Sequence, residues 1–196
     1  SAASDVYKRQ FLRCVPNMVV ATPSDESETR LLLSTCYQYP GPASVRYPRG
    51  AGCGAAESAG LETVEVGRGV VRREGRKIAI LGFGTLVSAA LAAADKLDAT
   101  VADMRFVKPI DRELILDLAA RHDALVTLED ASIMGGAGSA VLETLSAAGV
   151  QTPVLQLGLP DAFIDHGDQS ALLAGIGLDA AGIERSIRAR YADLLA

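Results

Sequence analysis

Three glycines follow two acidic residues in the segment LEDASIMGGAGSAV, residues 128–141, and a phosphate-binding turn has a similar composition. A strand, a glycine loop and a helix in that order place free backbone N–H groups at a helix N-terminus, where they can bind phosphate. The dinucleotide fingerprint needs a third glycine after Gly136 and Gly138, and Val141 stands at that position. The Gly-Lys-Ser/Thr ending of a P-loop is also missing from the segment. We therefore expect the loop Gly135–Gly138 to be structural, because tight turns require glycine for steric reasons alone.

A second Gly-x-Gly turn, formed by Gly82 and Gly84 in ILGFGTLVS, has Val87 in place of the third glycine. Dinucleotide binding further requires an acidic residue at the end of the second strand. Asp103 lies nearby, but it is followed by MRFVKP and is as easily a surface residue. Both turns therefore favour a structural interpretation over a nucleotide site.

The remaining acidic and imidazole candidates have ordinary explanations. Glu129 and Asp130 follow an apolar run, and the carboxyl ends of parallel strands are where α/β sites form. Neighbouring residues in an extended segment point to opposite faces, so we expect two solvated acids that share no proton. His122 stands in the last turn of an expected helix, where it can cap free carbonyls. His166 lies in a loop between aspartates, a hint of a site, although solvated loop residues are commoner.

Two arginines in the segment VRYPRG, Arg46 and Arg49, are stronger candidates for binding. Arg49 follows Pro48 at the carboxyl end of an expected strand and precedes Gly50. A guanidinium in that position can bind a phosphate with two parallel hydrogen bonds. An ordinary surface arginine explains the pattern equally well, and both interpretations stay open at this point.

The composition limits the classes of protein that fit. Hydrophobic residues make up 49% of the 196 residues, enough for a sizeable core, and the formal net charge is -5. An acidic chain has no surplus of basic side chains with which to neutralise nucleic-acid or membrane phosphates. The apolar stretches are too short to cross a bilayer. Three widely spaced cysteines and two histidines favour a reducing cytoplasm over disulfides or a zinc site.

Strands and helices alternate along the second half of the chain. From Lys77 we expect four strands, with the sequences KIAILGF, ATVADMRF, ALVTLE and TPVLQLGL. The helices between them are expected over residues 85–97, 111–121 and 137–148. A final helix is expected from Asp179. This alternation predicts an α/β fold with a mostly parallel sheet and helices on both faces. The preceding segment VGRGVVRREGRKIAILGFG is expected to form a hairpin that turns at Glu74-Gly75.

Composition also predicts the domain boundaries. Residues 1–10 lack periodicity and are expected to be a disordered or foreign end. In residues 11–50 the sequence predicts two strands and a helix capped by Thr22. These elements would form too small a core to stand alone, so we expect residues 11–50 to be poorly anchored. Residues 51–60 are glycine-rich and predict a linker, and residues 61–196 predict a complete domain.

The segments LRCVPNMVVATPSDESETRLLL, PASVRYPRG, VADMRFVKPID, ALVTLEDASIMGGAGSAV and LGLPDAFIDHGDQ together resemble the 1-deoxy-D-xylulose-5-phosphate synthase family. The resemblance runs from Phe11 to Ala196. It implies the end of a pyrimidine-binding domain over 11–50 and a transketolase-type C-terminal domain over 61–196. The family's diphosphate-binding domain, catalytic histidines, tautomerisation glutamate and metal-binding residues have no counterpart in this chain.

The resemblance also implies the chemistry. The family is a homodimeric cytoplasmic transferase that uses thiamine diphosphate and Mg²⁺. It condenses pyruvate with glyceraldehyde 3-phosphate, and its product feeds isoprenoid, thiamine and pyridoxal synthesis. By resemblance, Arg49 would bind the triose phosphate, while no catalytic, cofactor or metal residue is expected here and the chain alone is expected to be inactive. A non-catalytic dimerisation module and a β-type subunit of a 2-oxoacid dehydrogenase remain alternatives.

Overall fold

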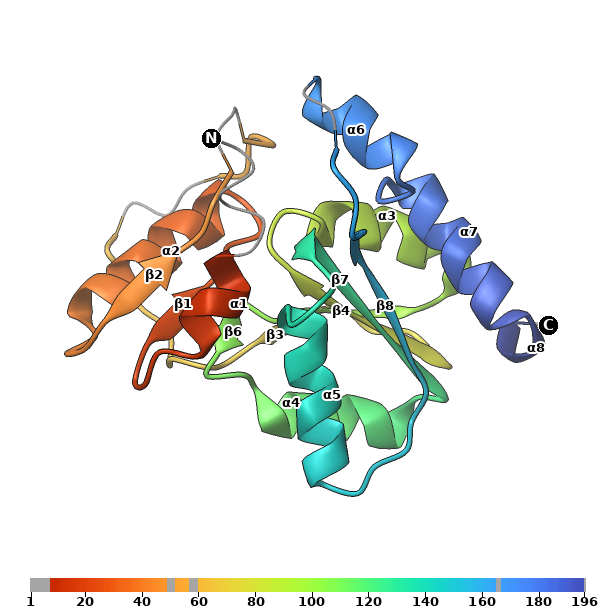
Figure 1. Ribbon diagram of the computed structural model, residues 1–196, viewed down its shortest axis with the longest axis horizontal. Helices are drawn as coiled ribbons and strands as arrows, with labels where there is room; N and C mark the ends of the chain where they lie inside the picture. The colour runs from red at the N-terminus through yellow and green to blue at the C-terminus, as the bar shows by residue number, and fades with distance from the viewer. Residues whose placement is uncertain (1–7, 49–51, 57–59, 165–166, 196) are drawn as a thin grey trace.

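The computed structural model describes residues 8–48, 52–56, 60–164 and 167–195. Its strands are β1 Val19–Ala21, β2 Ala43–Val45, β3 Val70–Arg73, β4 Ile78–Phe83, β5 Thr100–Asp103, β6 Phe106–Lys108, β7 Ala124–Ser132 and β8 Val154–Leu159. Its helices are α1 Lys8–Arg13, α2 Glu26–Gln38, α3 Val87–Leu97, α4 Arg112–Arg121, α5 Ala137–Ala147, α6 Gln169–Gly175, α7 Ala180–Arg190 and α8 Ala192–Leu195. These elements form a large α/β unit with a smaller sheet beside it (Figure 1).

A five-stranded sheet in the order β3-β5-β4-β7-β8 forms the centre of the large unit. The neighbours β5, β4, β7 and β8 are parallel, and only the edge strand β3 runs antiparallel to its neighbour β5. All six residues of β4 are buried, as expected for a strand whose sheet is covered on both faces. The expected α/β class with a mostly parallel sheet is confirmed.

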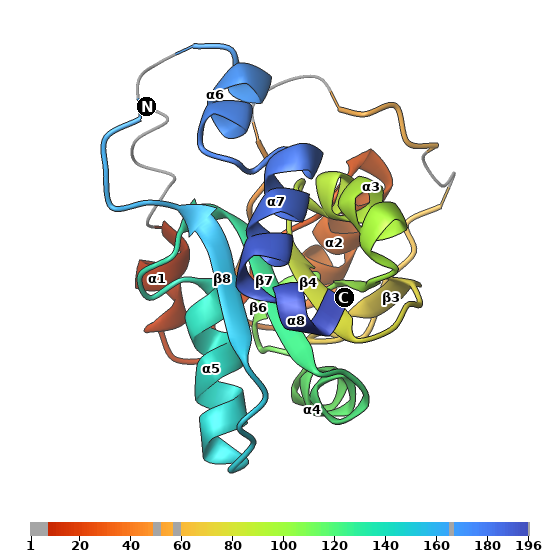
Figure 2. The same ribbon diagram turned by 90° about the vertical axis from the view of Figure 1, so that its right-hand side faces the viewer.

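Helices cover both faces of this sheet (Figure 2). On one face α3 and α7 pack over Ile78 and Ile80, and on the other α4 and α5 pack over Ala79 and Leu81. Alternate residues of one strand therefore supply two separate apolar cores. The C-terminal helix α7 begins after its N-cap Asp179, as expected.

Two expectations for the strands are wrong. β3 does not form a hairpin with β4, because β5 lies between them and pairs with both. The expected single strand over residues 99–106 is divided into β5 and β6, which belong to different sheets. Arg105, between them, has a φ of 55°, and this left-handed conformation redirects the chain from one sheet to the other.

β6 anchors the N-terminal part of the chain to the large unit. In the three-stranded sheet β2-β1-β6, β1 pairs in parallel with β2 and antiparallel with β6. Phe106 of β6 is fully buried against Val19, Ala21 and Leu32. The expectation that residues 11–50 would be poorly anchored is therefore wrong for the described residues up to 48. β6, which lies far along the sequence, supplies the missing sheet partner.

A buried ion cluster reinforces this contact. Glu28 of α2 is 4% exposed, and the guanidinium of Arg105 donates to both of its carboxylate oxygens over 2.7 and 2.8 Å. Arg72 donates to Glu28 over 2.8 Å and to Asp103 over 3.3 Å. Asp103 also accepts a 2.6 Å hydrogen bond from Ser24, and burial raises the pKa of its carboxyl. Asp103 is fully buried, so the interpretation as a surface residue is wrong.

The ends of the N-terminal part also differ from expectation. Residues 8–10 belong to α1, and Arg9 is 1% exposed. The expectation of a disordered end is therefore wrong for these three residues. Residues 1–7 lie outside the described part of the chain. Asp25, and not Thr22, caps α2, because its carboxylate accepts from the Glu28 backbone N–H over 2.8 Å.

The described part of the expected linker is tied to α2. The carboxylate of Glu26 accepts from the Gly54 backbone N–H over 2.7 Å, and this hydrogen bond is the main cause that lowers the pKa of Glu26 to about 2. No helix or strand forms in the described residues 52–56. The position of a domain boundary between 51 and 60 stays a prediction.

Candidate functional site

The paired acids Glu129 and Asp130 lie near the carboxyl end of β7, which is an interior strand of the five-stranded sheet. Both are buried, with 2% and 8% of their surface exposed. The expectation of solvated acids is wrong, because each carboxylate has buried partners from distant parts of the chain.

Glu129 binds the N-terminus of α5. Its two carboxylate oxygens accept from the backbone N–H groups of Ala137 and Gly138, each over 3.0 Å. A side chain on Gly136 would place its Cβ 2.5 Å from the Glu129 carboxylate, so only glycine fits there. The site that a phosphate would use at this helix N-terminus is therefore filled by the protein's own carboxylate. This occupancy explains the glycine loop structurally, as the sequence predicted.

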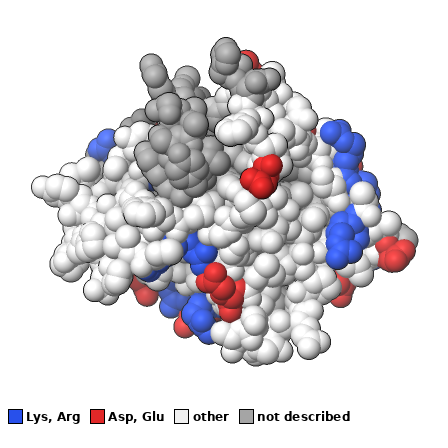
Figure 3. All heavy atoms as spheres, in the orientation of Figure 1, with Lys and Arg blue, Asp and Glu red and all other residues white. Residues whose placement is uncertain are grey.

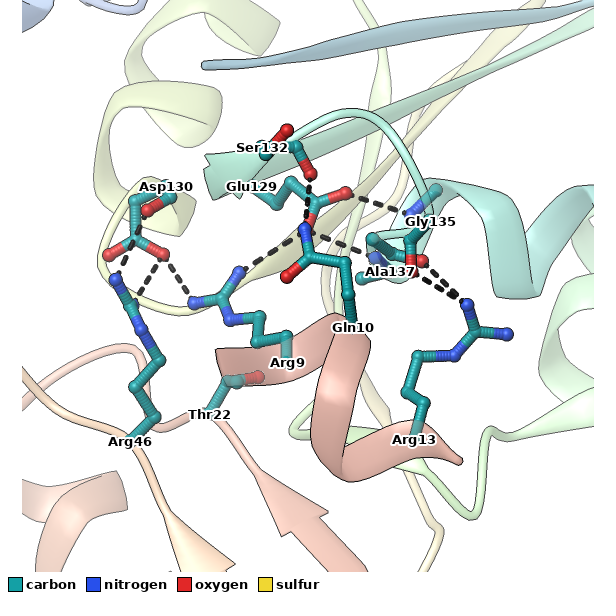
Figure 4. A network of polar contacts seen from close by, with 12 residues as sticks. Arg9, Gln10, Arg13, Thr22, Arg46, Glu129, Asp130, Ser132, Gly135 and Ala137 are labelled. Atoms are coloured by element: carbon teal, nitrogen blue, oxygen red, sulfur yellow. Dashed lines mark hydrogen bonds and ion pairs between the residues drawn. The ribbon is translucent and has the colours of Figure 1, made fainter. Parts of the chain in front are cut away.

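Asp130 forms ion pairs with two arginines. Arg9 of α1 and Arg46, which follows β2, both donate to its Oδ1 atom, the latter over 2.9 Å. Figure 4 shows the two guanidinium groups reaching the same carboxylate from different elements. Burial on its own would raise the pKa of Asp130, but the two guanidinium groups outweigh it and hold the pKa below its usual range.

Helix α1 covers the loop between β7 and α5. Arg9 lies 3.5 Å from the Glu129 carboxylate, Gln10 donates to the Ser132 carbonyl over 2.9 Å, and Arg13 donates to the Gly135 carbonyl over 2.9 Å (Figure 4). The sequence interpretation missed these contacts. The spacing of four residues between Arg9 and Arg13, which places both on one helix face, was the available signal.

We expect Glu129→Ala to lower the free energy of unfolding by about 1–3 kcal/mol, because two buried backbone N–H groups lose their acceptor. Urea denaturation of the chain followed by circular dichroism measures this change. Glu113→Ala is the control, since that glutamate is 80% exposed on α4 and its ion-pair partner is Arg68. A loss no larger than that of the control would contradict the capping role.

The other candidates are dispersed. Arg49 and His166 lie outside the described residues. His122 is the C-cap residue of α4, with Nδ1 2.8 Å from the Leu118 carbonyl and Nε2 2.7 Å from the Thr100 hydroxyl. Its expected role at the helix end is confirmed, and the Thr100 contact explains its burial.

A groove of about 920 Å³ lies between the N-terminal part and the large unit. Residues from the start of α2, the start of α3 and the α6–α7 region line it, together with Tyr47 and Pro48. Its volume is in the range of small-molecule sites. Pro48 immediately precedes Arg49 in the chain.

Some kinds of site are not found in the described ranges. They contain no group of three or more His, Cys, Asp or Glu side chains arranged to hold a metal ion. Within the same ranges, every helix is too short or too polar for a membrane span. On the face drawn in Figure 3, the coloured lysines and arginines occur in small groups, several with acidic side chains beside them.

Comparison with known proteins identifies the class. Residues 67–183 match the family model described as the transketolase C-terminal domain, and the chain belongs to this family. The match begins before β3 and ends within α7, so it includes all five strands of the large sheet and the helices between them.

More specific similarities agree with the motifs. The chain is 80% identical over 190 residues to a 1-deoxy-D-xylulose-5-phosphate synthase of Bordetella parapertussis, covering 97% of this chain and 31% of that protein. It is 61% identical over 188 residues to the synthase of Thiobacillus denitrificans, covering 96% of this chain and 30% of that protein. A solved structure titled "Split gene transketolase, inactive beta4 tetramer" aligns with a TM-score of 0.85 and 34% identity, covering 97% of this chain and 63% of that one. The chain thus spans about a third of the length of the two curated synthases.

Proposed function

We propose that this chain is the C-terminal part of a 1-deoxy-D-xylulose-5-phosphate synthase, a transferase that condenses pyruvate with glyceraldehyde 3-phosphate and releases CO₂. The identity of 80% over 97% of the chain carries this proposal. The N-terminal and C-terminal parts of the chain both support it, since the alignment extends well beyond the transketolase C-terminal domain at residues 67–183.

In this proposal the chain contributes architecture and one substrate contact. Arg49 binds the phosphate of the triose, and the groove that Pro48 lines supports a ligand in this part of the chain. Thiamine diphosphate and Mg²⁺, which supply the decarboxylation chemistry when bound, are held by parts of the longer protein outside this chain. The two buried acids of the site fit this division of roles. The Glu129 carboxylate already binds backbone N–H groups, and the Asp130 carboxylate already binds two arginines.

Assembly and location belong to the same proposal. We place the complete protein in the cytoplasm as a homodimer, acting on small molecules without nucleic acid or membrane. The three cysteines are free thiols, which suits a reducing compartment. The similar split-gene transketolase is described as an inactive tetramer of β chains, and this supports a chain that associates but needs another part for activity.

The test compares the complete protein with the 196-residue chain. We expect the complete protein to form 1-deoxy-D-xylulose 5-phosphate and CO₂ from the two substrates, and the chain alone to form neither. In titration calorimetry with thiamine diphosphate and excess Mg²⁺, the chain should show no saturable binding tighter than roughly 100 μM, about -5.5 kcal/mol.

Two outcomes contradict parts of this proposal. Tighter binding by the 196-residue chain would show that it carries its own cofactor site. A complete protein that is folded and dimeric but makes no product from these substrates would favour the non-catalytic association module or another thiamine-diphosphate reaction.

A further inference from the structure

The two edge strands of the five-stranded sheet differ in how they are protected. β3, at one edge, has four residues, two of them arginines, and its pairing with β5 contains a register shift. β8, at the other edge, has six residues, VLQLGL, without a charge or a proline. Edge strands that stay open to solvent are normally short, charged or irregular, because a regular uncharged edge pairs with other chains. β3 therefore has the features of a free edge, and β8 has those of a covered edge.

The hydrogen bonds at the two ends of β8 show which of its residues face β7. The Pro153 carbonyl accepts from the Leu125 N–H over 2.8 Å, and the Leu159 carbonyl accepts from the Ile133 N–H over 3.2 Å. In a strand, the N–H and C=O groups of one residue point to the same side, and those of the next residue point to the other side. The odd-numbered residues of β8 therefore bond to β7.

The even-numbered residues of β8 present their backbone groups to the open edge. These residues are Val154, Gln156 and Gly158. In the part of the chain that the structure describes, the sheet has no further strand on this side. An N–H or C=O group that is withdrawn from water needs a partner. The open edge of β8 thus offers three residues whose donors and acceptors can pair with a strand of another chain.

The surface around β8 is uncharged. The sequence has no Asp, Glu, Lys or Arg between Glu143 and Asp161. Every residue of β8 is only partly buried, and Leu155 and Leu157 lie at the margin of the core under α7. Figure 3, drawn in the orientation of Figure 1, shows the surface along β8 white over most of its length. Charge therefore does not oppose the approach of an identical surface.

The outward-facing residues of β8 are symmetric about Gln156. Antiparallel pairing of two copies around a two-fold axis at Gln156 places this residue opposite its own copy. It also places Val154 opposite Gly158 of the second copy. Each of these residue pairs exchanges two hydrogen bonds. The register therefore uses all of the outward backbone groups of both strands.

The side chains fit the same register. Leu155 of one copy lies opposite Leu157 of the second copy, so the partly exposed leucines at the margin of each core cover one another. Asp161, the first charged residue after β8, lies opposite Gln151 of the second copy, and no like charges meet.

We propose that β8 is the surface through which two copies of this chain associate: the two strands pair antiparallel around a two-fold axis and join both five-stranded sheets into one. Such a contact is isologous, because the same residues of both copies form it. The inference rests on the proposed function only for the homodimer, to which it assigns an interface. It does not depend on catalytic activity.

Amide hydrogen exchange of the 196-residue chain tests the backbone pattern. Sedimentation velocity first establishes the concentrations at which the chain is a dimer or a monomer, and NMR then measures exchange at each. In the monomer, the N–H groups of Leu155 and Leu157 should exchange slowly because they bond to β7. Those of Val154, Gln156 and Gly158 should exchange on the order of 100-fold faster. In the dimer all five should exchange slowly.

Two substitutions at one position test the contact itself. Gln156→Pro and Gln156→Ala both remove the side chain, but only proline removes the outward N–H. Because that N–H points away from β7, the strand keeps its place in the sheet. Gln156→Pro is expected to raise the Kd of the dimer at least about tenfold, since each copy loses a hydrogen bond to the other. Gln156→Ala, the matched control, should raise it less than about threefold, and circular dichroism checks that both variants fold.

Three results with the 196-residue chain would overturn the inference. They are a chain that stays monomeric up to roughly 100 μM, about -5.5 kcal/mol, a dimer in which the three outward N–H groups still exchange rapidly, or a folded Gln156→Pro variant that dimerises like Gln156→Ala. If Gln156→Pro does not fold, the exchange pattern of the unsubstituted chain decides.

The complete protein separates this inference from the proposed function. If the outward N–H groups of β8 exchange slowly there at every dilution but rapidly in the 196-residue chain, another part of the longer protein covers β8, and the second copy is the wrong partner. A complete protein that makes no product but loses its dimer on Gln156→Pro substitution contradicts the proposed reaction and supports the interface.

Discussion

Arg49→Ala in the complete protein is expected to raise the KM for glyceraldehyde 3-phosphate far more than the KM for pyruvate. A charge-assisted pair of hydrogen bonds to phosphate contributes about 2–4 kcal/mol, equivalent to a change of roughly 30- to 1000-fold. Pyruvate carries no phosphate, so its KM should stay close to that of the unsubstituted protein. Initial rates measured while each substrate is varied separately give both constants.

Arg76→Ala is the control for this experiment, because the Arg76 side chain is 85% exposed and pairs with Asp98 on the surface. It should change neither KM. Equal increases for both substrates in Arg49→Ala would indicate a folding defect, and an unchanged KM for the triose phosphate would leave Arg49 as an ordinary surface arginine.

Glu28→Ala is expected to lower the free energy of unfolding by about 3 kcal/mol. Removing one partner of a buried ion pair costs about 3–5 kcal/mol because the other charge stays buried and unpaired. Arg72 is 33% exposed and can be hydrated, which places the expected loss at the lower end of that range. Denaturation of the 196-residue chain in urea measures the change.

Two variants check that the loss comes from the ion cluster. Glu65→Ala removes a glutamate that is 73% exposed, and it should change the stability by less than about 0.5 kcal/mol. Glu28→Gln keeps a hydrogen-bond acceptor for Arg105 and should lie between the two. If Glu28→Ala is no more damaging than Glu65→Ala, the cluster contributes no net stability.

The sequence was sufficient for the α/β class because that prediction depends on local patterns. The continuous apolar run of β4 and the alternation of strands with helices are visible in the sequence itself. The structural role of the glycine loop was also predictable, since the missing third glycine is a local feature. The motifs in turn identified the relatives that the comparisons found.

The burial of the charged residues was not predictable in the same way. Asp130 and Arg9 are 121 residues apart in the chain, and Asp103 and Ser24 are 79 apart. A carboxylate after an apolar run is buried only where the fold brings a hydrogen-bonding or charged partner to it from elsewhere in the chain. Local sequence patterns do not indicate whether such a partner exists. For the same reason the division between β5 and β6 was missed, because β6 pairs with β1, which lies at Val19–Ala21, far earlier in the chain.

The transfer of the chain from β5 in one sheet to β6 in the other limits where the protein can be shortened. A chain that begins after residue 60 would keep the whole five-stranded sheet but remove β1, the strand with which β6 pairs. The backbone N–H and C=O groups of β6 would then lie on an open edge, beside the uncovered ring of Phe106. Such edges pair with other chains, and the shortened protein would tend to self-associate or aggregate. The family boundary at residue 67 is therefore a poor guide to a cleavage point, because β1 covers that edge.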